Sequence, residues 1–363
     1  MSANRLMLIA LCAFAPAPSA PAFPPGHIYV SETTREGCLE QGNWVRQIDP
    51  TTGDSWVIAG FDDGLCTNNG LAFTPDGEHL FVLNYSRDNI LAIDSEGTIS
   101  VRYNRSNGVA APFGQNGLAF DRYGNLYLSM ILLEPLWRIR RGAETAEPLL
   151  PRGTLVNGGS AIAMTPSGDI MTSMYVSGNT GALALVTPTG QVSQFGPEEI
   201  TGPPNTIAID SRGDIFFSAS PGLGRYDAMD PSTRRILPTT LIGYRAFALS
   251  DDERTLWVTD QVGVYAVDPN TGERTEVFRF PTGHRGGRGI AVYIPPRPGD
   301  LNCDKRVNHF DIDPFVAALV DAEFYQQNYG WCRRDLADVN RDGAIDVFDV
   351  DAFVDAVVSQ SDR

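Results

Sequence analysis

Two twelve-residue segments in the last quarter of the chain carry oxygen-bearing side chains at the same five positions. They read DLNCDKRVNHFD from Asp300 and DVNRDGAIDVFD from Asp338. Positions 1, 3, 5, 9 and 12 are Asp300, Asn302, Asp304, Asn308 and Asp311 in the first segment, and Asp338, Asn340, Asp342, Asp346 and Asp349 in the second. Calcium takes about six to eight oxygen ligands, and this spacing wraps them around one point, with the position 7 carbonyl of Arg306 or Ala344 added. The sequence therefore predicts two Ca²⁺ sites.

The two segments are expected to bind calcium unequally. Position 6 makes the sharp turn of such a loop and prefers glycine, which the second segment has as Gly343. The first segment has Lys305 there, which adds a steric cost and a positive charge. Both segments end in Asp rather than Glu, which shortens the reach for bidentate ligation. We therefore expect weaker calcium binding at the first segment.

An apolar run of helical character follows each segment, IDPFVAALV from Ile312 and VDAFVDAVV from Val350. Three apolar residues recur at i, i+1 and i+4, which predicts two helices packed on each other. They are Phe315, Val316 and Leu319 in the first run and Phe353, Val354 and Val357 in the second. A unit of this size has a small core, which two ions and a disulfide would stabilise.

This duplicated arrangement of a loop followed by one helix resembles a type I dockerin, a small all-α module with paired EF-hand loops, over Gly299 to Val358. Pro295, Pro296 and Pro298 leave no room for a helix before the first loop. The resemblance implies a cohesin-like protein partner and a role in tethering enzymes that act on polysaccharides. Cellulosomal dockerins commonly carry Ser-Thr at loop positions 10 and 11, where this chain has His309-Phe310 and Val347-Phe348.

The preceding part of the chain repeats one phrase, a short apolar strand, a turn and a second strand. The copies include NGLAFTPDGEHLFVLN, NGLAFDRYGNLYLSM and NTIAIDSRGDIFFSA. Equivalent apolar positions recur every 40–47 residues, at Leu71, Leu118, Ile162, Ile207, Phe247 and Ile290. This period suits a four-stranded propeller blade, and a β-sandwich would not need so regular a repeat. The sixth copy has one strand only, so we expect N-terminal strands to complete its blade and a six-bladed β-propeller to result.

These phrases resemble the NHL-repeat and gluconolactonase propellers over Gly26 to Pro295. The gluconolactonase resemblance implies a divalent cation at one mouth of the central channel, held by a Glu and an Asp beside Asn residues. The matching strand starts carry Asn69, Asn116, Ser160, Asn205, Arg245 and Arg288. No carboxylate falls among them, although Glu32 and Asp260 on second strands are within reach. A second interpretation is that the Asn side chains cap turns at the strand starts. For Arg245 and Arg288 a second interpretation is that they contact an anionic ligand.

The N-terminus predicts export. Arg5 precedes an apolar run from Leu6 to Phe14 and a small-residue site ending at Ala20, which favours a cleaved signal peptide over an uncleaved anchor. The run is too short to span a bilayer. We therefore expect a secreted protein.

Four cysteines remain beyond the signal, and an even count in an exported chain suggests disulfides. Three pairings are open. Sequence separation favours Cys38 with Cys66 and Cys303 with Cys332.

Charge narrows the choice of partners. The net charge of −16 argues against nucleic acid and anionic membranes as partners. Half of this charge lies between Asp300 and Arg363, where there are 14 acidic and 6 basic residues.

The predicted organisation is a signal at 1–20, a propeller at 26–295, a linker at 296–299 and a dockerin-like module at 300–358. Two functions follow as hypotheses, a secreted calcium-binding interaction protein and a tethered lactonase-like or carbohydrate-active enzyme, with the propeller's ligand unspecified.

Overall fold

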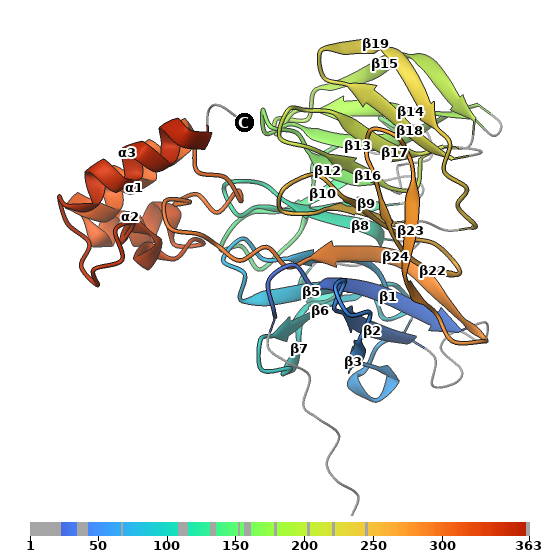
Figure 1. Ribbon diagram of the computed structural model, residues 1–363, viewed down its shortest axis with the longest axis horizontal. Helices are drawn as coiled ribbons and strands as arrows, with labels where there is room; N and C mark the ends of the chain where they lie inside the picture. Colours follow the sequence, from blue (N-terminus) through green and yellow to red (C-terminus); the bar gives the residue numbers. More distant parts are fainter. Residues whose placement is uncertain are drawn as a thin grey trace, which may run out of the picture.

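The computed structural model describes residues 23–34, 43–66, 68–107, 115–130, 136–151, 153–155, 161–177, 180–201, 204–219, 222–243 and 246–360. The expected export signal, Cys38, Ser160 and Arg245 lie outside this set, as does the side chain of Asn116. The described chain forms six four-stranded antiparallel sheets followed by a helical C-terminal unit (Figure 1).

Five of the sheets are built from consecutive strands, as the repeat predicts. The first comprises β4 (Asn68–Phe73), β5 (His79–Asn84), β6 (Asn89–Asp94) and β7 (Ile99–Tyr103). The second comprises β8 (Gln115–Phe120), β9 (Leu126–Met130), β10 (Leu136–Ile139) and β11 (Glu147–Pro148). The third comprises β12 (Ile162–Met164), β13 (Ile170–Ser177), β14 (Thr180–Val186) and β15 (Val192–Thr201). The fourth comprises β16 (Ile207–Ile209), β17 (Ile215–Ser218), β18 (Leu223–Asp227) and β19 (Asp230–Leu237). The fifth comprises β20 (Ala246–Leu249), β21 (Leu256–Thr259), β22 (Gly263–Val267) and β23 (Arg274–Arg279).

The sixth sheet joins the two ends of the propeller. Its order is β24-β1-β2-β3, which pairs the last strand of the propeller with three N-terminal strands. These strands are β24 (His284–Val292), β1 (Ile28–Thr34), β2 (Asn43–Ile48) and β3 (Ser55–Ala59). Neighbouring inner strands contact each other in the ring β24, β4, β8, β12, β16, β20 and back to β24. The six-bladed propeller and its closure by both chain ends are therefore confirmed.

The turn between the first and second strand of each consecutive blade follows one design. A Thr, Asp or Ser side chain at the end of the first strand accepts a hydrogen bond from the backbone N–H that opens the second. The acceptors are Thr74, Asp121, Thr165, Asp210 and Ser250, at 2.8–3.0 Å. The expected turn glycines, including Gly77 and Gly124, have positive φ, whereas the fifth blade places Glu253 there at φ 57°. The inner-strand phrases thus encode a capped hairpin.

The C-terminal unit contains three helices, α1 (Ile312–Val320), α2 (Ala322–Tyr329) and α3 (Asp349–Gln360). Short 3₁₀ helices are η2 (Phe61–Asp63), η3 (Tyr85–Arg87) and η4 (Arg105–Asn107) in the propeller, and η5 (His309–Asp311) and η6 (Arg334–Ala337) in this unit. The rings of Phe315 and Phe353 stack with centroids 3.9 Å apart, so α1 and α3 pack as predicted. Helix α2 has no counterpart in the sequence analysis, although Asp321 caps it by accepting from Phe324 N at 2.9 Å. None of the described helices is long and apolar enough to cross a membrane.

The helical unit sits against turns of the propeller (Figure 1), those that join β8 to β9, β10 to β11 and β20 to β21. The Arg122 guanidinium lies over the Phe310 ring at 4.2 Å, and the Arg141 guanidinium over the Trp331 ring at the same distance. Arg297 forms an ion pair with Asp251. These contacts anchor the segment that the sequence describes as a linker.

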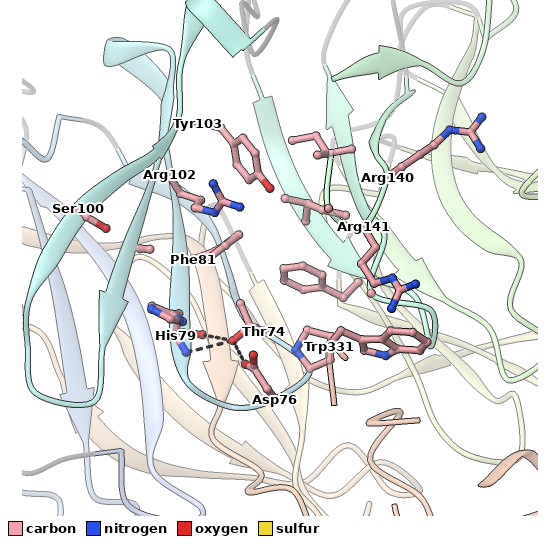
Figure 2. Close-up of a pocket in the computed structure, with 17 residues that line it drawn as sticks. Thr74, Asp76, His79, Phe81, Ser100, Arg102, Tyr103, Arg140, Arg141 and Trp331 are labelled. Carbon is pink, nitrogen blue, oxygen red and sulfur yellow. Dashed lines mark hydrogen bonds between the residues drawn. The ribbon is translucent and has the colours of Figure 1, made fainter. Parts of the chain in front are cut away.

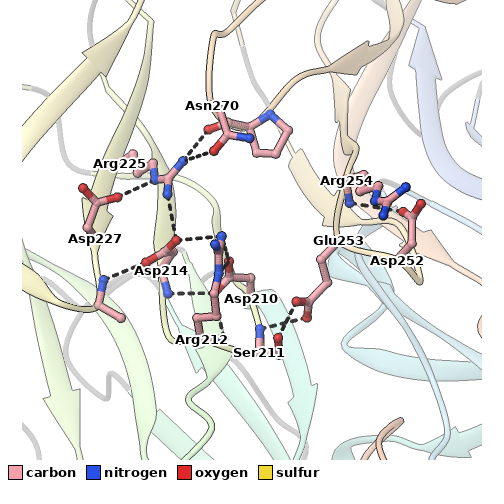
Figure 3. Close-up of polar contacts among 12 residues, drawn as sticks. Asp210, Ser211, Arg212, Asp214, Arg225, Asp227, Asp252, Glu253, Arg254 and Asn270 are labelled. Carbon is pink, nitrogen blue, oxygen red and sulfur yellow. Dashed lines mark hydrogen bonds and ion pairs between the residues drawn. The ribbon is translucent and has the colours of Figure 1, made fainter. Parts of the chain in front are cut away.

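A charged network joins two blades (Figure 3), and Glu253 extends it to the helical unit. The buried Arg225 on β18 contacts Asp214 at 2.7 Å and Asp227 at 2.8 Å, and donates to the Pro269 carbonyl oxygen of the next blade at 2.9 Å. Ser211 donates to Glu253, which lies 3.8 Å from Arg306. The network therefore fixes the position of the fifth blade relative to the fourth and provides a polar contact for the first calcium-type loop.

Candidate functional site

The two calcium-type loops share one hydrogen-bond skeleton. In the first, Asp300 at position 1 accepts from Asp304 N and Lys305 N at 3.2 and 3.0 Å. In the second, Asp338 accepts from the equivalent Asp342 N and Gly343 N at 3.0 and 2.9 Å. This shared skeleton shows that the sequence duplication is also a duplication of local structure.

The aspartates at position 12 complete that skeleton. Asp311 accepts from Leu301 N, Asn302 N and Asn308 N at 2.8–3.1 Å. Asp349 accepts from Asn340 N and Asp346 N at 3.1 and 3.0 Å. Each of these aspartates therefore ties the start of its loop to the helix that follows, and both are buried.

The donor set of these loops fits a hard divalent cation. Burial and the charges of Asp311 and Asp304 raise the pKa of Asp300 well above its ordinary value, and burial raises the pKa of Asp311 to about 7. Mutual repulsion of buried carboxylates is relieved by a bound cation. Among the described residues, ligand atoms that all lie within 4.8 Å of one another occur at Asp76, Glu78 and His79, and the loop carboxylates do not form such a group.

Position 6 differs between the loops as the sequence suggests. Lys305 has φ 74° and Gly343 has φ 90°, so both occupy the left-handed region. A side chain is strained there, whereas glycine is not. Position 4 is also left-handed, at Cys303 and Arg341. The relative calcium affinity of the two loops stays a prediction.

A disulfide joins Cys303 to Cys332, with Cα atoms 5.5 Å apart, as the sequence separation favours. Cys66 is also disulfide-bonded, and its predicted partner, Cys38, lies outside the described residues. The Trp331 indole N–H, beside Cys332, donates to the Asn302 carbonyl oxygen at 3.0 Å. The bridge and this hydrogen bond tie the first loop to the segment that precedes the second.

At the propeller mouth where the inner strands begin, the structure places several predicted residues, and the residues that it describes there form no ring of carboxylates. Asn69 is buried at the start of β4, Asn205 N donates to Ser218 Oγ at 2.8 Å, and Arg288 is half-buried on β24. Asp260 accepts from Ile242 N, Val262 N and Gly263 N at 2.7–3.1 Å and so organises its own turn. These residues do not fit a metal site of the gluconolactonase type.

Glu32 is committed to a different cluster at this mouth. Its buried carboxylate contacts Arg46 Nε at 2.6 Å and His284 Nδ1. The His284 ring stacks in parallel on Trp44, with centroids 4.7 Å apart. A buried carboxylate that orients an imidazole is the arrangement of a general base. No sequence pattern predicts this pair, because 252 residues separate its members.

Hydroxyl groups on second strands line the same end of the blades. Ser31 Oγ accepts from Gly289 N at 2.8 Å and Ser173 Oγ from Ala161 N at 3.3 Å, in the way that Ser218 does. All three side chains are buried. The repeat phrases have Ser or Thr at the fourth residue of most second strands. These hydroxyl groups hydrogen-bond to the start of the neighbouring inner strand.

Comparison with known proteins identifies the propeller by its shape. No family model and no curated protein sequence matches this chain. A chain of a nidogen/laminin complex superposes with a TM-score of 0.60 at 15% identity, covering 74% of this chain and 98% of that chain. A gluconolactonase from Xanthomonas campestris gives 0.52 at 17% identity, covering 75% and 91%. TolB from Acinetobacter baumannii gives 0.56 at 14% identity, covering 73% and 66%. At these identities the similarity shows the fold alone, so any activity has to be inferred from the residues of this chain.

Proposed function

We propose that this chain is a calcium-loaded interaction protein, in which the C-terminal helical unit binds two Ca²⁺ ions and docks on a protein partner while the propeller presents a binding surface. The proposal includes export through the signal at 1–20, the propeller at 26–295, the linker at 296–299 and the docking module at 300–358. A cohesin-like domain is the proposed partner. Attachment to a polysaccharide-degrading assembly follows from that partner as a further part of the proposal.

A duplicated apolar row carries this proposal. Val316 and Val320 on α1 are 49% and 77% exposed, and Val354 and Val358, 38 residues further on, are 50% and 58% exposed. The sequence pattern predicts Val316 and Val354 in the helix–helix core, and this part of the prediction is wrong because both face solvent. Apolar rows kept on both copies of a repeat outside the core support a partner surface.

Calcium would act on this surface through the loops. Asp311 and Asp349 bind backbone N–H groups of their loops and stand at the start of α1 and α3. A cation held by each loop would therefore fix the direction of the helix that follows it. We expect partner binding to require calcium for this reason.

The test is a binding measurement with the full chain. Surface plasmon resonance on immobilised cohesin domains should give calcium-dependent binding that EDTA abolishes and that Val316→Asp combined with Val354→Asp weakens at least tenfold. Asp355→Ala changes an exposed residue of α3 and serves as the matched control. Binding that survives EDTA and the double substitution would remove the proposal.

The Glu32–His284 pair favours a second candidate function, hydrolysis of a lactone at the propeller mouth. The imidazole would take a proton from water, the hydroxide would add to the carbonyl carbon, and the ring C–O bond would break as the proton passes to the leaving oxygen. Glu32 would orient the ring. Sugar-lactone hydrolysis that is lost with His284→Ala and kept with His309→Ala would support it; equal rates for both variants would reject it.

A further inference from the structure

A cavity of about 270 Å³ lies at the seam between two blades and the helical unit (Figure 2). Its walls come from the β4–β7 blade, the β8–β11 blade and Trp331. The volume is close to the lower end of about 300–1,000 Å³ that ligand pockets span. Size and position therefore make it a candidate site distinct from the calcium-type loops and the propeller mouth.

The inner wall of the cavity is apolar and aromatic. Phe81 lies 5.5 Å from Phe120 and 6.4 Å from Tyr103 between ring centroids. Leu126 and Ile139 extend this wall. Trp331 adds an indole from the helical unit, and it packs so closely that a Cβ on Gly124 would lie 2.9 Å from its Cγ. The wall suits a flat apolar body.

Arginines line the same cavity, and they are not equivalent. Arg140 contacts the Glu147 carboxylate at 2.8 Å, and Figure 2 shows it turned away from Trp331. Arg102 lies over the Tyr103 ring at 4.6 Å, and Arg141 stacks on Trp331 and donates to the Gln327 carbonyl oxygen at 3.2 Å. Within the described part of the chain, neither Arg102 nor Arg141 forms an ion pair.

The lining has three arginines and one aspartate, so it carries a net positive charge in a chain whose net charge is −16. Asp76 is an acidic residue of the lining, and its Oδ1 accepts from Thr74 Oγ1 at 2.6 Å and Glu78 N at 3.0 Å. Arg102 and Arg141 are both exposed residues. The unpaired cations beside an aromatic wall point to a ligand with the opposite charge.

We propose that this cavity binds a small ligand with a flat, aromatic body and one oxyanion, with Arg102 and Arg141 as the donors to the oxyanion and Phe81, Phe120 and Trp331 around the body. The site is incomplete without the helical unit, because Trp331 supplies one wall. Trp331 also bonds to Asn302, a residue of the first calcium-type loop. Ligand binding and docking of the helical unit therefore stabilise each other.

The experiment uses full-length protein with calcium and three probes, phenylacetate, phenyl phosphate and uncharged 2-phenylethanol, by isothermal titration calorimetry at concentrations up to about 10 mM. At least one anion should bind about tenfold more tightly than 2-phenylethanol, and a preference between the two anions would distinguish a carboxylate from a phosphate ligand. Arg102→Gln and Arg141→Gln should each weaken binding about tenfold. Arg140→Gln, the matched control, should change it less than about twofold.

Arg141→Gln also removes a contact with Trp331, so its effect on binding has two causes. Arg102→Gln has one cause, because Arg102 has no described contact with the helical unit. Circular dichroism and thermal unfolding confirm that each variant is folded. The proposal is overturned when neither anion binds wild-type protein, when 2-phenylethanol binds as well as the anions, or when folded Arg102→Gln and Arg140→Gln bind alike.

Discussion

Replacing Lys305 by glycine should tighten calcium binding at the first loop by about five- to thirtyfold. Lys305 has φ 74° at the position where the second loop has Gly343 at φ 90°. A left-handed residue with a Cβ costs about 1–2 kcal/mol, and the greater freedom of glycine in the metal-free loop offsets about 0.5–1 kcal/mol of this. The charge of Asp300, a proposed calcium ligand, also acts on the Lys305 ammonium, and removal of this ammonium adds about 0.5–1 kcal/mol. The sum of about 1–2 kcal/mol gives the stated range.

The assay is calorimetric titration of full-length protein carrying Asp338→Ala, so that the first loop dominates the signal. Lys305→Ala is the decisive control, because it removes the charge and keeps the left-handed Cβ. It should recover about half of the gain in binding free energy. Equal affinities for Lys305→Gly and Lys305→Ala would refute the backbone argument, and no gain in either would refute the whole account of this loop.

Three further predictions concern pH, a buried ion network and a close backbone contact. The pKa of Asp311 rises from 3.8 to about 7, so the metal-free module should lose stability as pH rises through this window, and calcium affinity of the Asp338→Ala variant should be lower at pH 6 than at pH 8. Arg225→Met removes one guanidinium from Asp214 and Asp227, while Arg212 still contacts Asp214 and Arg235 still contacts Asp227. It should therefore cost about 1–3 kcal/mol in urea unfolding, against less than about 0.5 kcal/mol for the exposed Arg254→Met. Gly289→Ala would place a Cβ 2.0 Å from the Asn69 carbonyl oxygen and should lower stability by about 1–3 kcal/mol, measured as a fall in Tm; an unchanged Tm would contradict the close packing of β24 on β4.

Much of the fold could be predicted because it is local and repeated. One short sequence phrase contains the inner strand, the hairpin turn and the second strand of a blade. The number of blades therefore follows from the number of times that this phrase recurs. The closing blade was also predictable, since its single strand from Arg288 needs partners and the N-terminus has three strands to supply. The loops were predictable for the same reason, because the hydrogen bonds that their aspartates accept from backbone N–H groups are made within twelve residues.

The rest depends on contacts between distant segments, which spacing does not encode. Glu32 and His284 meet only because β1 pairs with β24. Trp331 reaches the turn at Gly124 only because the helical unit docks on the propeller. The error at Val316 has a similar origin: helical periodicity gives the apolar face of α1 but not how much of it α3 covers.

Docking on the propeller also explains how two copies of one loop come to differ in surroundings. Asp300 and Asn302 of the first loop are buried, and its Phe310 meets Arg122, whereas Asn340 and Asp342 of the second loop are exposed. The equivalent of Phe310 is Phe348, which is 74% exposed beside the exposed Val347. A partner that contacts loop positions 10 and 11 would meet exposed residues in the second loop. In the first loop, Phe310 already contacts Arg122 of the propeller. We therefore expect the second loop and α3 to dominate partner binding, so Phe348→Ala should weaken it more than Phe310→Ala in the full chain.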